Sequence, residues 1–590
     1  MFHSLCLAAC LSFASLSLAQ YTISIAVVQK PAPSALSAPL DASFAGFGIE
    51  PSNLFSFTGE AEPNQLSVTL LQNLADYSGA PPHIRLGGNT GDYMIWKPSF
   101  TDYRIDHNEK SVGQGAFASD SMIFGPGYFK ALDRFPKDTP VTFGLNLAYQ
   151  ESDYIDNIVK EAQAAVDNMK KVKLYSFEIG NEPDLYLQNG FRSGVWNGDV
   201  YIKEFLERAK AVYERVLKPA GLPMDFFETS STASTIGTTF EIEPLHKAGL
   251  TDGDSNGLTY ISAWNQHDYF YFIDVTPTPL TLNDLVQLDN TNKQFAYWEK
   301  QIKTGLDIGL PYVLREMCSA GPIGVHGITD TFGAALWTLN FFLYAATLNI
   351  SSVQMHMTDN SFASAWQPIN MYDKDPFVRP QYYAHAAMAQ IIGNGNGTTQ
   401  IGLLHAKNTI PESYKGYFRA YGAYSNGNLQ SVILINSREA NTSVSDKESL
   451  IFTLDLGPAH EDKTLFLSHL TAPGTDSQSD TTWNGVVFLP KSGKPSAVPN
   501  FRPQTLRTSS SGQVTIPVRD SQAVVVNIGW LLGSHAVVKP DGGKPQHTPK
   551  KSAAGPTRSG PGMAKVTAVA TGTAVLVGNI LEGQRGRCEG

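Results

Sequence analysis

Cysteine is scarce in this sequence, with four residues among 590. Cys6 and Cys10 lie near the amino terminus, whereas Cys318 and Cys588 are far apart and show no spacing typical of a disulfide framework. A metal site built from cysteines is therefore excluded. The fold must be stabilised by an apolar core, and a hydrophobic content of 42% in a chain of this length is ample for one.

Positive charge is also in short supply. The 44 Lys and Arg residues are outnumbered by 54 Asp and Glu residues, which gives a net charge of -10 and argues against a polyanionic partner. The sequence has no His-Glu-x-x-His zinc motif, and the glycines of the segment 87–91 lack the spacing of a dinucleotide-binding loop. We therefore expect no nucleic-acid partner, no metal and no organic cofactor.

The two ends of the chain have the composition of processing and tail segments. Residues 1–19 are apolar and end in Ser17-Leu18-Ala19, so we expect a signal peptide and a secreted, extracellular protein. The segment 533–590 is rich in Pro, Gly, Ser and Lys, and we expect a disordered tail. Membrane attachment is expected only if the apolar run Val566–Leu581 is a lipid-anchor signal, and the basic residues after it argue against that.

Three N-glycosylation sequons fit a secretory route. They begin at Asn349, Asn396 and Asn441. Asn396 lies in a glycine-rich turn, where we expect an exposed side chain, whereas Asn349 lies beside an apolar run.

Between residues 41 and 392, eight short apolar runs alternate with amphipathic patterns. The runs are Phe44–Glu50, His83–Gly87, Val141–Ala148, Leu174–Glu182, Met224–Ser230, Tyr260–Asp268, Pro311–Met317 and Ile350–Met357. The helical patterns between them include Gln65–Tyr77, Tyr154–Lys170, Val200–Leu217, Asn292–Ile308 and Thr331–Leu348. Strands that alternate with helices indicate a parallel sheet, and eight repeats predict an α/β fold with a closed (β/α)₈ TIM barrel.

The sequence pattern changes at residue 393. A Gly- and Asn-rich turn is followed by short alternating runs that predict an antiparallel C-terminal β-sandwich domain over 393–532. These runs are Gly416–Tyr424, Gln430–Asn436, Leu450–Leu456, Thr464–Leu470 and Gln522–Ile528. The segment 20–40 contains a further strand pattern, which we expect to join the sandwich and make that domain discontinuous.

Two glutamates stand at the ends of predicted barrel strands. The fourth run ends in Asn181-Glu182-Pro183, and the seventh ends in Arg315-Glu316-Met317. Barrel enzymes place their active sites at the carboxyl ends of the strands, so both side chains would face one cleft. Retaining glycoside hydrolysis uses one carboxyl group as acid and a second, about 5–5.5 Å away, as nucleophile. A single glutamate at a strand end is usually solvated or ion-paired; the pair is what predicts a glycosidase.

The sequence resembles the retaining barrel glycosidases, and within them glycoside hydrolase family 79, the β-glucuronidase and heparanase family, in its secreted fungal form. The resemblance spans roughly residues 21–530. The segments that carry it are Phe47-Gly48-Ile49-Glu50, Ile84-Arg85-Leu86-Gly87-Gly88-Asn89-Thr90-Gly91-Asp92, Phe177-Glu178-Ile179-Gly180-Asn181-Glu182-Pro183, Gln266-His267-Asp268-Tyr269 and Phe332-Gly333-Ala334-Ala335-Leu336-Trp337.

The resemblance implies a role for each matched residue. Glu182 would be the acid/base and Glu316 the nucleophile of a double displacement. Asn181 would bind the sugar 2-hydroxyl, and Asp92 would accept hydrogen bonds from other sugar hydroxyls. His267 and Tyr269 would orient the nucleophile, and Arg85 would favour its ionised form. The structural alternatives are a buried ion-pair partner for Arg85 and a core histidine for His267.

The sequence departs from the family after the nucleophile. Amides of Gly321 and Gly324 could bind a uronate carboxylate, but the segment before Trp366-Gln367-Pro368 lacks the tyrosine expected there. A lost hydroxyl removes a donor to a charged group, about 1.5–3 kcal/mol. Arg379 or His326 are the candidates to replace it. Trp366 itself is expected to bind the substrate.

We therefore predict an exo-acting β-glycosidase with a carbohydrate substrate, a β-glucuronidase or 4-O-methyl-β-glucuronidase. The alternatives are a glycosidase for a neutral sugar and a non-catalytic carbohydrate-binding barrel. A serine hydrolase is disfavoured, because the G-x-S-x-G match at residues 253–257 precedes a predicted strand, whereas the nucleophile elbow stands between a strand and a helix.

Overall fold

The computed structural model describes residues 21–111, 118–233, 235–253 and 257–537. The expected signal peptide, nearly all of the expected tail and the serine of the 253–257 motif lie outside the described residues. Within the described part of the chain, no helix is both long enough and apolar enough to span a membrane.

Eight parallel strands close into a barrel, so the predicted fold is confirmed. Each of the eight predicted runs overlaps one of them. In order around the barrel, the strands are β2 (Ala45–Ile49), β3 (Ile84–Leu86), β7 (Pro140–Leu145), β8 (Lys173–Ile179), β9 (Phe227–Thr232), β10 (Ile261–His267), β11 (Tyr312–Met317) and β12 (Ser352–Met357). β12 pairs with β2 to complete the ring. All of β2, β9, β11 and β12 is buried, because helices cover the outside while side chains fill the inside.

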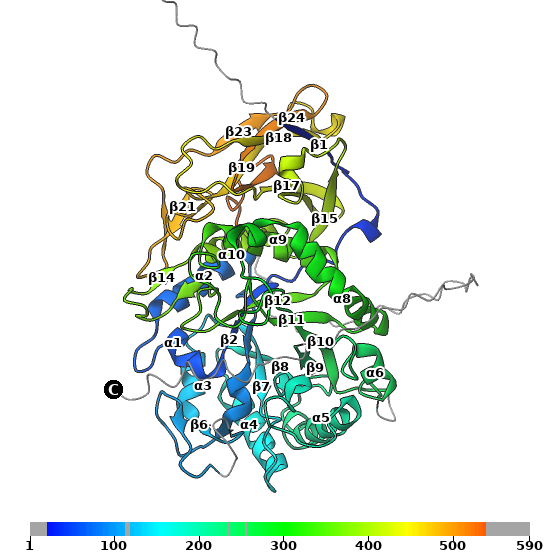
Figure 1. Ribbon diagram of the computed structural model, residues 1–590, viewed down its shortest axis with the longest axis vertical. Coiled ribbons are helices and arrows are strands. Elements are labelled where there is room, and N and C mark those ends of the chain that lie inside the picture. Colours follow the sequence, from blue (N-terminus) through cyan, green and yellow to red (C-terminus); the bar gives the residue numbers. More distant parts are fainter. Residues whose placement is uncertain (1–20, 112–117, 234, 254–256, 538–590) are drawn as a thin grey trace, which may run out of the picture.

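Helices surround the barrel (Figure 1). They include α2 (Gln65–Ser78), α3 (Pro126–Leu132), α4 (Tyr154–Asn168), α5 (Gly198–Val212), α8 (Asp289–Ile308), α9 (Phe332–Thr347) and α10 (Pro380–Asn394). Local sequence sets some of their ends. Asn64 and Asn197 cap the starts of α2 and α5 by accepting backbone N–H bonds, and Gly79 and Gly309 end α2 and α8 in the left-handed conformation.

A second sheet of twelve strands forms the C-terminal sandwich. Its strands are β1 (Thr22–Ala26), β15 (Thr399–Ala406), β16 (Phe418–Ser425), β17 (Asn428–Asn436), β18 (Ser449–Asp455), β19 (Thr464–Thr471), β20 (Thr482–Trp483), β21 (Val486–Phe488), β22 (Pro495–Ala497), β23 (Gln504–Arg507), β24 (Gln513–Arg519) and β25 (Gln522–Ile528). β1 lies between β15 and β18, antiparallel to the first and parallel to the second. Its Ile23 packs in an apolar core with Phe452, Ile516 and Val524.

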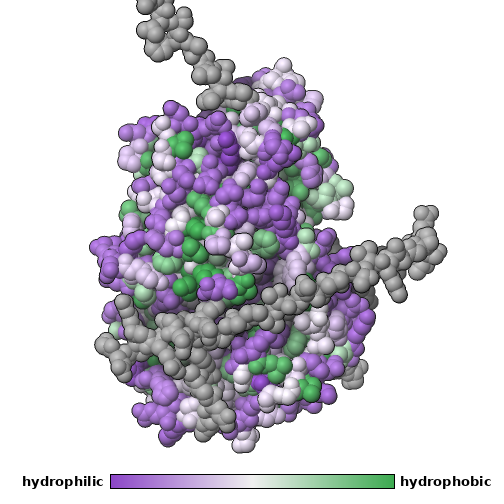
Figure 2. All heavy atoms as spheres, in the orientation of Figure 1, coloured by the Kyte–Doolittle hydropathy of each residue, from purple (hydrophilic) through white to green (hydrophobic). Residues whose placement is uncertain are grey.

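The two helices α9 and α10 lie between the barrel and the sandwich in Figure 1. Almost every residue of both helices is buried, because one side packs on the barrel and the other on the sandwich. Polar contacts fix this interface: Tyr421 donates to Asn340 at 2.8 Å, and Trp483 donates to Gln390 at 2.8 Å. On the face shown in Figure 2, apolar side chains form only small patches among hydrophilic ones.

Two small sheets interrupt the barrel pattern. β4 (Met94–Trp96), β5 (Asp106–His107) and β6 (Met122–Phe124) form one of them between β3 and β7. β13 (Trp366–Gln367) and β14 (Phe377–Val378) pair after β12. Both follow the carboxyl end of a barrel strand, so they enlarge the face on which the two glutamates stand.

Candidate active site

Glu182 and Glu316 stand on the fourth and seventh strands of the barrel, counted from β2. Glu182 follows β8, and Glu316 is the fifth residue of β11. One carboxylate oxygen of each glutamate and one ring nitrogen of His267 lie within 4.8 Å of one another. This proximity is in keeping with the short separation, about 5–5.5 Å, of the two carboxyl groups in a retaining glycosidase.

The backbone turns sharply at Glu182 to bring its side chain into the barrel mouth. The residue has a φ of 48°, in the left-handed region, and its N–H donates to the carbonyl of Ser231 at 2.8 Å. Its Oε1 lies 2.9 Å from Nδ1 of His267, a residue of β10. A non-glycine residue with positive φ is uncommon and often marks a functional site.

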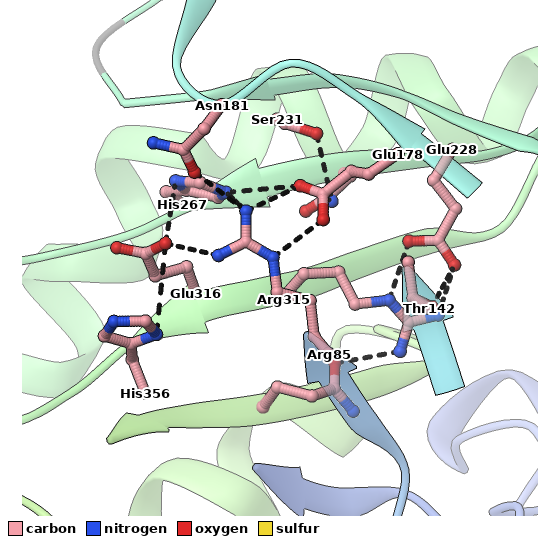
Figure 3. Close-up of polar contacts among 12 residues, drawn as sticks. Arg85, Thr142, Glu178, Asn181, Glu228, Ser231, His267, Arg315, Glu316 and His356 are labelled. Atoms are coloured by element: carbon pink, nitrogen blue, oxygen red, sulfur yellow. Dashed lines mark hydrogen bonds and ion pairs between the residues drawn. The ribbon is translucent and has the colours of Figure 1, made fainter. Parts of the chain in front are cut away.

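Glu316 is held from several sides (Figure 3). Its Oε1 accepts the hydroxyl of Tyr269 at 3.0 Å, and its Oε2 accepts Nη1 of Arg85. Nδ1 of His267 lies 3.8 Å from Oε2, and Nδ1 of His356 lies 4.0 Å from the same oxygen. These contacts fix the carboxylate in one orientation.

The charges around Glu316 keep it ionised. Burial alone would raise its pKa, but His356, His267 and Arg85 lower the pKa to about 2. His267 shows the opposite balance, because burial would lower its pKa, whereas the charge of Glu316 and hydrogen bonds to Glu178 and Glu182 raise the pKa to about 9. At neutral pH the site therefore holds a carboxylate on Glu316 beside an imidazolium on His267.

Arg85 is the fully buried centre of this network. Its Nε and Nη2 each donate to one oxygen of Glu178 at 2.7 Å, in a bidentate pair, and Nη2 also donates to Oδ1 of Asn181 at 2.8 Å. Burial opposes ionisation of Glu178, but the guanidinium of Arg85 holds the pKa of that carboxyl well below its usual range. Arg85 is thus both the buried ion-pair partner and the neighbour of Glu316.

The side chain of Asp92, expected to bind sugar hydroxyls, is bound instead by groups of the protein itself. Its Oδ1 accepts the backbone N–H groups of Leu147 and Ala148, and its Oδ2 accepts the N–H of Asn181 at 2.9 Å and the hydroxyl of Tyr186 at 2.6 Å. The side chain is buried, and burial raises its pKa to about 6 against these hydrogen bonds. Both oxygens are occupied, so Asp92 braces the loop that carries Asn181 and is not aimed at a sugar.

Gly321, Gly324 and Trp366, which were also expected to contact the substrate, are engaged within the protein instead. The N–H of Gly321 donates to the carbonyl of Tyr271, and the N–H of Gly324 donates to that of Ala320. These amides are therefore not free for a carboxylate. Trp366 is fully buried, and its Nε1 donates to Ser67 at 2.9 Å, so it belongs to the core between β2 and α10.

Both candidates for a replacement carboxylate donor make polar contacts with other side chains or with the backbone. Arg379 is buried and donates to Ser364 and Gln367, and Nδ1 of His326 lies 2.7 Å from Asp330. The side-chain amide nitrogen of Asn181, Nδ2, donates to Oδ1 of Asn89 at 2.9 Å.

Two residues of the site were missed from the sequence. Glu50 follows β2, and His356 lies on β12, with Nε2 of the histidine 3.3 Å from Oε2 of the glutamate. Glu50 belongs to a motif that implies no role for it, and His356 lies in an apolar run. The signal available was position, because both lie at carboxyl ends of barrel strands.

A metal ion could in principle use the atoms that Glu182, His267 and Glu316 offer. The cationic groups of Arg85 and His267 already lie against Glu316, and a third cation there would be repelled by both. The charge arrangement favours chemistry by the carboxyl groups themselves.

A second buried ion pair lies deeper in the barrel. Arg315 binds Glu228 in a bidentate manner at 2.6 and 2.7 Å, and its Nη1 donates to Gln354 at 2.9 Å. We call Arg85–Glu178 the upper pair and Arg315–Glu228 the lower pair. The lower pair borders a pocket of about 770 Å³ whose lining includes Asp41 and Pro311, which precede strands, so it lies at the amino-terminal end of the barrel.

Comparison with known sequences links the chain to glycosidases. Residues 420–525 match the Glycosyl hydrolase family 79 C-terminal beta domain. A beta-glucuronidase of Aspergillus niger is 27% identical over 528 residues, which cover 85% of this chain and 93% of that protein. A beta-glucuronidase of Neurospora crassa is 25% identical over 546 residues, which cover 85% and 94%.

Comparison with solved structures supports the architecture. A 4-O-alpha-L-rhamnosyl-beta-D-glucuronidase from Fusarium oxysporum superposes with a TM-score of 0.68 and 20% sequence identity, covering 86% of this chain and all of that one. At this identity the likeness concerns the fold, a barrel followed by a sandwich.

Proposed function

We propose that the chain is a glycoside hydrolase of family 79, and that it acts as a retaining, exo-acting β-glucuronidase that removes terminal β-glucuronic acid or its 4-O-methyl ether from glycans. One observation carries the proposal: oxygens of Glu182 and Glu316 lie within 4.8 Å at the carboxyl ends of strands four and seven. The curated relatives from Aspergillus niger and Neurospora crassa, both named beta-glucuronidase, support the substrate class.

The reaction proceeds in two displacements. In the first, the Glu182 carboxyl group gives its proton to the glycosidic oxygen, that oxygen leaves with the bonding electron pair, and Glu316 forms an ester bond with the anomeric carbon. In the second, Glu182 takes a proton from water, whose oxygen displaces Glu316. Two inversions at one carbon retain the β configuration.

The surrounding residues serve this chemistry without touching the leaving group. Arg85 and Tyr269 fix the two oxygens of Glu316, so that the carboxylate is aligned before the sugar binds. Esterification removes the charge of Glu316, and Glu182 then acts as base without a facing carboxylate. Asn181, held by Arg85, is placed to bind the sugar 2-hydroxyl.

A panel of nitrophenyl glycosides tests the substrate. The β-glucuronide should be hydrolysed with a higher kcat/KM than the β-glucoside, β-xyloside or β-galactoside. A neutral hexoside is the second candidate, because the amides of Gly321 and Gly324 are already occupied. Preference for the glucoside would establish that candidate, and release from none of the four would end the glycosidase proposal for these sugars.

Variants of Glu182 test its role as acid. Glu182→Ala should retain the first step on aryl substrates with good leaving groups and lose it on poor ones, because only poor leaving groups need the proton. Equal loss of kcat/KM across a leaving-group series would contradict the assignment.

The secretion of the protein and the limits of its domains are part of the same proposal. We infer an extracellular protein with a signal peptide at 1–19, a catalytic barrel at 41–392, a sandwich at 393–532 joined by the segment 20–40, and a tail at 533–590. Expression in a fungal host followed by amino-terminal sequencing of the protein in the medium tests the first boundary, which should place Gln20 at the new terminus.

A further inference from the structure

The nucleophile proposed above has a neighbour that its family resemblance did not assign. His356 points from β12 into the barrel mouth with only 6% of its side chain exposed. Its Nε2 lies 3.3 Å from Oε2 of Glu50, and its Nδ1 lies 4.0 Å from Oε2 of Glu316. Nδ1 is buried and makes no hydrogen bond to the described residues. The ring therefore stands between two carboxylates, one from the start of the barrel and one from its seventh strand.

The backbone around this ring is shaped to admit it. Gly48 is paired with His356 across β2 and β12, and a Cβ on Gly48 would stand 2.9 Å from Nδ1. Gly88 has a φ of 146°, and a Cβ there would lie 2.2 Å from the Glu50 carboxylate. Any larger residue at either position would displace the ring or its partner, so Gly48 on β2 and Gly88 in the loop after β3 make room for the Glu50–His356 pair.

Glu50 is itself fixed. Its Oε1 accepts both the N–H of Thr90 at 2.7 Å and the hydroxyl of Thr90 at 2.5 Å, which leaves Oε2 turned to His356. A carboxylate anchored at one end and an imidazole confined between glycines form a rigid support. Rigid support of this kind is what a precisely aligned catalytic group requires.

We propose that His356 is a positioning residue which, as an imidazolium held by Glu50, directs an N–H at Glu316 and keeps that carboxylate ionised and aligned for attack. The inference rests on the proposed function, in which Glu316 is the nucleophile. A doubly protonated ring presents one N–H to each carboxylate, whereas a neutral ring can serve only one of them. The proposal assigns no contact between His356 and the leaving group.

The other charged groups that face this ring or its target lie on every neighbouring strand. Glu316 comes from β11, Glu50 from the end of β2, Arg85 from β3 and His267 from β10. Arg85 and His267 also lie against Glu316, so His356 is one of three basic side chains around one carboxylate. The charges of His356, His267 and Arg85 all lower the pKa of Glu316, and Arg85 lowers it further through its hydrogen bond.

The consequence is a defined pH effect. A nucleophile must be ionised, so the acid limb of kcat/KM follows the ionisation of Glu316 in the free enzyme. Removal of a positive charge about 4 Å away should raise the pKa of Glu316, and the acid limb of His356→Gln should move toward neutral pH by about one pH unit or more. Glu50→Gln should move it in the same direction by less, because the imidazole remains.

The experiment measures the pH dependence of kcat/KM for an aryl β-glucuronide, together with the pH dependence of covalent labelling of Glu316 by a 2-deoxy-2-fluoro glycosyl fluoride. Labelling reports nucleophilic attack alone. Both acid limbs should shift together in His356→Gln. His385→Gln is the matched control: it replaces another buried histidine, which stacks on Phe47 and is bound to the carbonyl of Ala45, and both limbs should stay in place.

The possible outcomes separate the two proposals. If the wild-type protein neither hydrolyses nor is labelled, the proposed function fails. If the wild type is active and His356→Gln loses only kcat, with acid limbs that coincide with those of the wild type, the role of His356 is refuted while the function stands. A loss of folding in His356→Gln would show in its thermal unfolding midpoint, and Glu50→Gln then provides the same test.

Discussion

The upper and lower pairs are two buried Arg–Glu ion pairs in one barrel, and they differ in what the third arginine nitrogen binds. Both are bidentate at 2.6–2.7 Å. In the lower pair, the remaining nitrogen of Arg315 donates to the neutral Gln354. In the upper pair, the remaining nitrogen of Arg85 donates to the carboxylate of Glu316.

Because of this difference, we expect the lower pair to stabilise the fold and the upper pair to support the reaction as well. The lower pair is complete in itself, since the hydroxyl of Ser176 satisfies Glu228 further and every contact is with the barrel wall. The upper pair binds an additional carboxylate, that of Glu316, which lies at the barrel mouth. The same two residue types thus fill the lower barrel and, one layer above, hold the proposed nucleophile in place.

Loss of Glu316 should have the largest effect on activity of all the changes to the two pairs and their neighbours. Glu316→Ala should reduce kcat by on the order of 10⁴–10⁶-fold, because the covalent step has no substitute, while Arg85 keeps Glu178 and the fold stays intact. Kinetics on the aryl glucuronide and an unfolding curve measure the two effects.

External azide sharpens this first prediction. In Glu316→Ala, azide should occupy the vacated space and yield a glycosyl azide of inverted configuration, identified by NMR. A Glu316→Ala protein with wild-type kcat would show that another group attacks.

Loss of Glu178 should affect both activity and stability. Glu178→Gln leaves the buried Arg85 without its bidentate partner, so the free energy of unfolding should fall by about 3–5 kcal/mol. Arg85 should also turn more fully to Glu316, and a misplaced nucleophile should lower kcat/KM by about 100-fold. Urea unfolding and steady-state kinetics measure both; an unchanged kcat/KM would show that the upper pair does not position Glu316.

Loss of Glu228 should affect stability alone. Glu228→Gln removes the counter-charge of Arg315 and should cost about 3–5 kcal/mol of unfolding free energy, as in the upper pair. Its kcat/KM should stay near that of the wild type at a temperature where the protein is folded. A large kcat loss in the folded variant would mean that the lower pair also supports the site.

Asp268 gives the smallest effect, and it is a carboxyl group with no cation partner among the described residues. Its Oδ1 accepts the indole N–H of Trp298 at 2.7 Å and its Oδ2 has no hydrogen-bond partner there, and burial raises its pKa from 3.8 to about 7. The folded chain therefore binds this proton more tightly than the unfolded chain, and its contribution to stability falls as pH rises from about 4 to 7.

Asp268→Asn should remove that dependence. The variant should gain about 2 kcal/mol relative to the wild type between pH 5 and pH 8. Unfolding curves at both pH values measure the difference. Glu178, whose pKa is lowered, behaves in the opposite sense: its contribution is present above its ordinary pKa and is lost as pH falls below it. A constant difference for Asp268→Asn would contradict its raised pKa.

The sequence sufficed for the barrel because barrel strands are buried on both faces and read as continuous apolar runs. It also located Glu182 and Glu316, since a strand end needs only the local pattern. It did not reveal the Glu50–His356 pair, because those side chains meet only when the last strand closes on the first. Nor did it reveal which way Asp92 and Trp366 point. A shift of one position along the backbone decides whether a side chain faces the cavity or the core, and the local sequence does not fix that shift.

The proposed function depends above all on attack of Glu316 on the sugar. The most direct measurement is peptide mass mapping of the wild-type protein after treatment with 2-deoxy-2-fluoro-β-glucuronosyl fluoride, which slows release of the intermediate. We expect one fluoroglucuronosyl group per chain, on the peptide that contains Glu316, and we expect activity to return when this group is lost. A label on any other residue, or turnover of the substrate with release of the α-anomer first, would contradict it.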